Sequence, residues 1–130
     1  MINQIIECIK KNIEVMSDEW ALATVPFCEL DEEIVDKLDI KQTLMRNGNN
    51  LSMEDIMNPD NEIGLHIYWD KVNHPDSVDI GLYLFGGGDL NLNKTLKEIL
   101  DTKEYKDIFN FGYKQLEMEE SLRQDERDEI

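Results

Sequence analysis

The chain has 130 residues, 41% of them hydrophobic, and 29 acidic side chains against 13 basic ones give a net charge of −16. This length suits one domain, and the apolar fraction is large enough for a core, which excludes wholesale disorder. The negative charge repels phosphate backbones and anionic lipid, so we expect no direct binding to nucleic acid or to a membrane. A basic protein or a cation is the favoured partner, and solubility alone is the competing explanation of the charge.

The cysteine count and the N-terminus indicate the compartment. Two cysteines, Cys8 and Cys28, are too few for a disulfide framework, so the prediction is free, buried thiols. The first residues lack a basic start and carry Glu7 within their apolar run, unlike a signal peptide. No stretch approaches the 18 apolar residues of a membrane span. The sequence therefore predicts a cytoplasmic protein.

The N-terminal third predicts a helix followed by an extended segment. Apolar residues recur at intervals of three and four over residues 2–16, which is typical of an amphipathic helix whose apolar side faces the core. The segment from Trp20 to Leu30 contains Pro26, which lacks the backbone donor that a central strand needs. We therefore expect an edge strand or an ordered loop there.

Residues 31–62 predict short helices separated by breaks. The apolar positions of residues 31–46 shift register near Asp39, where we expect the helix to break. Residues 47–50 are Asn and Gly, which favour a loop. Ser52 followed by acids is typical of a helix N-cap, and Pro59 ends that helix early.

The clearest periodicity lies in residues 63–85. Apolar and other side chains alternate over 63–70 and again over 77–85, as expected of two half-buried strands. The intervening residues include Asn73 and Pro75, which favour a turn. Because an isolated hairpin is marginally stable in water, the flanking helices must cover its apolar face.

The C-terminal third predicts a short strand and more helix. Leu90 and Leu92 alternate with asparagines, and helix is expected over 94–117, with a restart at Asp101 and with Gly112 inside it for close packing. The prediction is an α+β fold with a small antiparallel sheet centred on the hairpin and packed by helices 2–16 and 94–117. Residues 1–117 form the single domain, and 118–130 form an acidic tail that is frayed or disordered.

Motifs for chemistry are weak. The glycines at 86–88 precede Asp89, which would repel a phosphate, so we interpret them as a turn. His66, Asp70 and His74 have a helical metal spacing but fall on a strand and in a turn. No calcium-loop pattern is present, and a cysteine nucleophile with His66 lacks a supporting motif. The sequence therefore predicts no metal and no cofactor.

The acidic surface remains as the functional feature. Close charge pairs across an interface can contribute several kcal/mol, and long-range attraction speeds association. The leading hypothesis is a non-enzymatic inhibitor, an immunity protein or antitoxin, that neutralises a cognate basic nuclease toxin. The expected partner-binding residues are exposed acids with two tyrosine anchors: Glu32, Glu33, Asp36, Asp60, Asp76, Tyr68 and Tyr83.

Two alternatives stay open. A DNA mimic that inhibits a nucleic-acid enzyme, as in phage counter-defence, requires carboxylates spaced like duplex phosphates. A small enzyme that uses His66 requires a concave pocket around that residue with a second titratable group.

Overall fold

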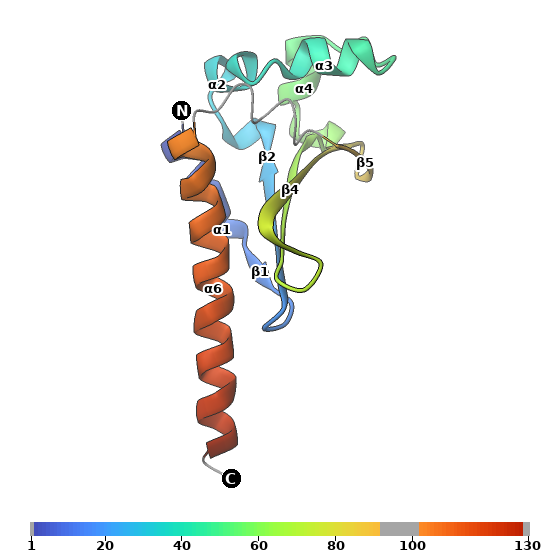
Figure 1. The fold of residues 1–130 in the computed structure, drawn as a ribbon. Helices are drawn as coiled ribbons and strands as arrows, with labels where there is room; N and C mark the ends of the chain where they lie inside the picture. The colour runs from blue at the N-terminus through green and yellow to red at the C-terminus, as the bar shows by residue number, and fades with distance from the viewer. Residues whose placement is uncertain (1, 92–101, 129–130) are drawn as a thin grey trace.

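The computed structural model describes residues 2–91 and 102–128, which form the predicted α+β fold (Figure 1). The sheet is antiparallel, with strand order β1-β2-β3-β4-β5. Its strands are β1 (Glu14–Val15), β2 (Trp20–Pro26), β3 (Gly64–Asp70), β4 (His74–Leu84) and β5 (Gly87–Asn91). The helices are α1 (Ile2–Asn12), α2 (Glu32–Lys37), α3 (Ile40–Arg46), α4 (Met53–Met57) and α6 (Thr102–Asp128), with the 3-10 turns η1 (Phe27–Glu29) and η2 (Pro59–Asn61).

The predicted hairpin is confirmed and is the centre of the sheet. β3 and β4 pair in antiparallel fashion with Leu65 opposite Leu82 and Ile67 opposite Ile80. The turn is shorter than predicted, so β4 begins at residue 74 instead of 77. Asp70 stabilises this short turn, because its carboxylate accepts hydrogen bonds from the backbone amides of Val72 and Asn73 at 3.0 and 2.9 Å.

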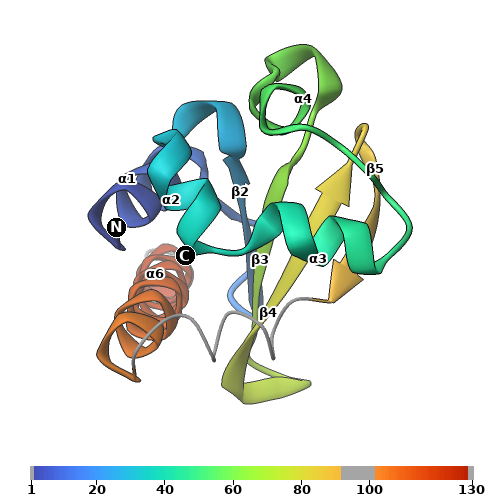
Figure 2. The ribbon, with the colours of Figure 1, turned by 90° about the horizontal axis from the view of Figure 1, so that it is seen from above.

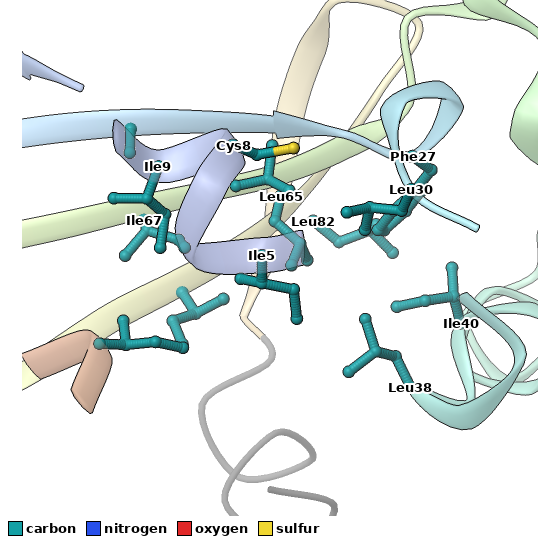
Figure 3. Close-up of a cluster of buried hydrophobic side chains, with 14 of the residues drawn as sticks. Ile5, Cys8, Ile9, Phe27, Leu30, Leu38, Ile40, Leu65, Ile67 and Leu82 are labelled. Atoms are coloured by element: carbon teal, nitrogen blue, oxygen red, sulfur yellow. The ribbon is translucent and has the colours of Figure 1, made fainter. Parts of the chain in front are cut away.

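One face of the sheet forms the core. Its side chains are all buried: Ala21, Ala23, Val25, Leu65, Ile67, Trp69, Val78, Ile80 and Leu82. Seen from above, α1 and α6 lie on the same side of the central strands (Figure 2). The α1 side chains Ile5, Cys8 and Ile9 pack with Leu65, Ile67 and Leu82, which join helix and sheet in one apolar cluster (Figure 3). Burial of apolar surface of this kind is the main stabilising contribution to such a fold.

The first helix is shorter than predicted. α1 ends at Asn12, and Glu14 and Val15 pair with Leu22 and Ala21 as β1. A backbone hydrogen bond from Met16 N to Trp20 O, 3.1 Å long, closes the turn between these strands. The apolar period continues to Met16, but that side chain is 49% exposed. Strand pairing with β2 therefore overrides the helical periodicity after residue 12.

The strand at Trp20–Pro26 is present, but the prediction of an edge strand or loop is wrong in part. β2 lies between β1 and β3. β1 is only two residues long and pairs with Ala21 and Leu22, whereas Pro26 pairs with Gly64 of β3 at the far end. Proline has no backbone N–H to donate. It is tolerated at residue 26 because β1 is too short to pair with this end of β2.

Gly112 permits α6 to lie directly on the sheet, as predicted. A Cβ atom at this position would overlap the indole ring of Trp69. The same indole donates a hydrogen bond from Nε1 to the backbone oxygen of Ile108, 3.1 Å away. The predicted helix segment at 94–101 lies outside the described residues. α6 begins at Thr102 and its backbone stays helical to Asp128, so the proposed acidic tail belongs to this helix.

The short helices gather at one end of the sheet (Figure 1). The predicted break between α2 and α3 is confirmed at Asp39, whose φ of 58° is left-handed. The predicted cap of α4 is also confirmed. The Ser52 side chain accepts a hydrogen bond from Asp55 N at 3.1 Å, and the Asp55 carboxylate accepts one from Ser52 N at 3.3 Å.

We expect Ser52→Ala to lower the free energy of unfolding by about 1 kcal/mol, because it removes the acceptor for a helix amide. Urea denaturation followed by circular dichroism would measure this. Ser121→Ala, at an exposed position of α6, is the matched control and should change stability by less than about 0.5 kcal/mol. Equal effects of the two substitutions would contradict a capping role.

Candidate functional site

The face of the sheet opposite the core carries the candidate site. We call it the second face; its strand residues are Trp20, Leu22, Thr24, Pro26, His66, Tyr68, Asp79 and Tyr83. Leu22, Thr24, His66, Tyr68 and Asp79 are half-buried, and Trp20 is exposed. This face mixes aromatic and polar groups, whereas the core face is apolar. Partly exposed aromatic rings are typical anchors in protein interfaces.

A pocket of about 430 Å³ lies at the η2 end of the second face. Its walls come from four parts of the chain, namely the end of β2 with η1, the η2 turn, the start of β3, and the β4–β5 turn. The lining residues are Thr24, Pro26, Cys28, Asn58, Pro59, Glu62, Ile63, His66, Tyr83 and Gly86. This volume falls in the range of small-molecule and side-chain binding pockets.

Two rings, His66 and Tyr83, line the pocket, and Tyr68 adjoins them on the second face. His66 and Tyr83 stack with ring centroids 4.3 Å apart and planes 23° apart. Tyr68 meets His66 edge-on with centroids 6.0 Å apart, and its hydroxyl lies 3.4 Å from His66 Nδ1. Gly64 makes room for the stack, because a Cβ at that position would lie 2.5 Å from the Tyr83 hydroxyl oxygen and 2.5 Å from Val25 O. The rings are thus held in place by the strand backbone.

Burial raises the pKa of Tyr83, a wall of the pocket. Its side chain is only 7% exposed, and burial raises the pKa of its hydroxyl to about 12, with smaller contributions from the nearby Cys28, Glu29 and Glu62. The carboxylates of Glu29 and Glu62 are negative and disfavour the phenolate. Tyr83 therefore stays neutral near neutral pH.

We expect the stability of the protein to fall as the pH rises from about 10 to about 12. The pKa of Tyr83 is near its ordinary value of about 10 in the unfolded chain and about 12 in the folded one, so the unfolded state loses its proton first. The stabilisation that Tyr83 contributes is fully present below about pH 10. It is lost as the pH rises through the folded-state pKa of about 12. Urea denaturation at several pH values measures it, with Tyr83→Phe as the variant that should lack this component. An identical decline in Tyr83→Phe would contradict the assignment.

Two residues beside the pocket have left-handed backbones although neither is glycine. Glu62 has a φ of 47° and Phe85 a φ of 52°. A hydrogen bond of 3.2 Å from Gly86 N to Glu62 O joins the two turns. Phe85 is also 58% exposed. A left-handed backbone is unusual for a residue as bulky as phenylalanine. Backbone strain of this kind is concentrated at functional sites.

The acids expected to bind a partner fall into separate groups. Glu32, Glu33 and Asp36 are exposed on α2, where they line a hollow of about 430 Å³ together with Lys41 and Met53. Asp60 is exposed on η2, next to Pro59 of the aromatic pocket. Asp76 lies in β4, but its side chain is outside the described residues.

The predicted tyrosines lie together on the second face. Tyr68 is half-buried, whereas the buried Tyr83 serves as a wall of the pocket. Of the described residues that line the pocket, the sequence proposed Tyr83 as a partner anchor and His66 for the alternative enzyme; it did not propose Glu62 as a site residue, and it interpreted Gly86 as part of a turn. Glu62 and Gly86 lie in the turns before β3 and after β4, which the strand register brings together.

The cysteines differ from each other. Cys8 is buried as predicted, and burial followed by the charge of Glu29 raises the pKa of its thiol. Cys28 is exposed on η1, so the expectation of a buried thiol is wrong there, because the 3-10 turn directs it away from the core. Glu29 accepts a hydrogen bond from Lys11 Nζ at 3.1 Å, and this contact lowers the pKa of the carboxyl.

Within residues 2–91 and 102–128, no group of three or more His, Cys, Asp or Glu side chains has the arrangement of a metal site. The helices of these residues include none with the length and hydropathy needed to cross a bilayer. Comparisons of the chain with protein-family models, curated proteins and solved structures give no match.

Proposed function

We propose that this protein binds and neutralises a basic nuclease toxin in the cytoplasm, as an immunity protein or antitoxin. The observation that carries the proposal is the charge of the helical end, which we define as residues 31–62. It contains nine acidic and three basic side chains, a net charge of −6. One of the three cations, Arg46, already pairs with Asp39 at 3.3 Å.

Geometry supports the recognition of a protein. The helical end places α2, α4 and η2 at one end of the sheet, and the pocket on the second face adjoins η2 (Figure 1). Exposed acids on α2 and η2, with the aromatic pocket next to η2, suit the surface of an enzyme that holds nucleic acid by phosphate contacts, because such an enzyme presents Lys and Arg in its groove. Occupation of that groove would prevent access of the nucleic acid.

The test is capture of the partner followed by an activity assay. The tagged protein is incubated at low salt with extract of the cells that express it, and the retained proteins are identified and purified. We expect a basic nuclease whose activity is abolished at equimolar inhibitor. Retention of no basic protein, or full activity of the retained nuclease, would contradict the proposal. Capture of a DNA-binding enzyme that DNA displaces would favour the DNA mimic instead.

The pocket supports a second candidate function, a small enzyme that uses His66. Cys28, Glu62 and His66 line the same cavity, which is the concave site with further titratable groups that such an enzyme requires. The substitution His66→Ala separates the two functions. Loss of toxin neutralisation with normal partner binding would favour an enzyme, whereas unchanged neutralisation in cells would contradict it.

A further inference from the structure

We propose that the pocket between η2, β3 and the β4–β5 turn is a receptor for an arginine side chain of the partner protein, with Glu62 as the carboxylate and the His66–Tyr83 stack as the flat wall. The identity of the partner rests on the proposed function. The chemistry of the pocket can be tested without the partner.

The first argument is charge. Among the lining residues that the structure describes, Glu62 is the only carboxylate, and none is a lysine or an arginine. The Glu29 carboxylate also acts on the Tyr83 hydroxyl as a negative charge, and it is paired with Lys11 at 3.1 Å. The potential inside the pocket therefore favours a cation and disfavours a phosphate or a carboxylate.

The second argument is shape. The cavity is lined by a stacked pair of rings, two prolines and the carboxylate of the exposed Glu62. A guanidinium is planar, stacks on aromatic faces and bonds a carboxylate with two parallel N–H groups, whereas a lysine ammonium is a compact, strongly hydrated charge. These walls fit a guanidinium better than an ammonium.

The third argument is preorganisation. Glu62 and Phe85 hold left-handed backbones, and the hydrogen bond from Gly86 N to Glu62 O fixes one turn against the other. A Cβ at Gly86 would lie 2.5 Å from Glu62 Oε2, so glycine leaves room for this carboxylate. The exposed ring of Phe85 stands beside Gly86, where it can contact the segment that carries the arginine. The Glu62 side chain is exposed, and it is the backbone that carries it that is held in place, which reduces the freedom lost on binding.

The experiment is an NMR titration of the full chain with N-acetyl-arginine-N-methylamide. We expect the amide signals of Glu62, Ile63, His66 and Gly86 to shift and to saturate. The citrulline counterpart has the same shape without the charge and should bind about tenfold more weakly, as should the arginine probe to Glu62→Gln, because a charge-assisted hydrogen bond is worth about an order of magnitude. Glu54→Gln, an exposed acid of α4 outside the pocket, should leave the affinity unchanged.

The inference is overturned if arginine and citrulline probes bind equally, if the lysine counterpart binds as tightly as arginine, or if Glu62→Gln keeps full affinity with an otherwise unchanged spectrum. It is also overturned if the shifts occur on α2 instead of the pocket. None of these results would contradict toxin neutralisation, which could use the α2 acids alone. Conversely, arginine binding without any inhibited nuclease would contradict the proposed function and leave the pocket chemistry in place.

Discussion

The substitution Gly112→Ala should destabilise the protein by about 2–4 kcal/mol, although alanine is the better helix former by about 1 kcal/mol. The added methyl group has no space, because it would overlap the Trp69 ring. Moving α6 away to relieve the overlap would also weaken the hydrogen bond from Trp69 Nε1 to Ile108 O. An unsatisfied buried indole N–H adds about 1–3 kcal/mol to the effect of overpacking. Urea denaturation with circular dichroism detection measures the change.

Asn110→Ala is the control for this prediction. It makes the same helix-favouring change at an exposed position two residues away and should keep or slightly raise stability. A double variant with Trp69→Phe gives a second check, because the smaller ring makes space for the methyl group. Its destabilisation should be less than the total of the two single effects. Additive effects, or a stable Gly112→Ala protein, would show that α6 does not rest on Trp69.

Reversing the charge of the three exposed α2 acids should slow association with the cognate nuclease by about ten- to a thousandfold at low ionic strength. Electrostatic steering raises association rates by factors of this size. The variant is Glu32→Lys/Glu33→Lys/Asp36→Lys, and all three side chains are exposed and lie together on one helix. Stopped-flow fluorescence measures the association rate. The difference from wild type should shrink as salt is added, because the Debye length falls to about 8 Å at 0.15 M.

A second triple variant separates a local interface from net charge alone. Glu7→Lys/Glu14→Lys/Glu117→Lys changes the total charge by the same amount at exposed positions outside the helical end. We expect it to keep most of the wild-type association rate. If both variants slow association equally, the acids of α2 are not the steering surface and only the overall charge of the molecule matters.

Prediction from the sequence succeeded for elements whose local residue preferences agree with the burial of their side chains in the fold. The alternation over residues 63–85, the break at Asp39 and the cap at Ser52 are local features, and each is present. The end of the first helix was wrong, because Glu14 and Val15 pair with a strand that lies several residues further along the chain. Periodicity within a segment carries no information about such a pairing.

The site was less accessible to prediction. Tyr68 and Tyr83 were selected as aromatic residues of the hairpin, and the register places both on the second face. The pocket itself depends on contacts among residues near 26, 60 and 86, which only the folded sheet brings together. The left-handed backbone of Glu62 has no local signature, since glutamate is not a residue that favours it.

The two tryptophans differ in exposure to solvent, so their fluorescence can report on two different parts of the molecule. Trp69 is fully buried beneath α6, and Trp20 is 39% exposed on the second face. An aqueous quencher should therefore reach Trp20 and spare Trp69 in the native state. A ligand that covers the second face would protect Trp20 from the quencher and leave the fluorescence of Trp69 unchanged. Detachment of α6 would instead expose Trp69 to the quencher first. Quenching thus distinguishes occupation of that face from loss of the fold in a single unlabelled sample.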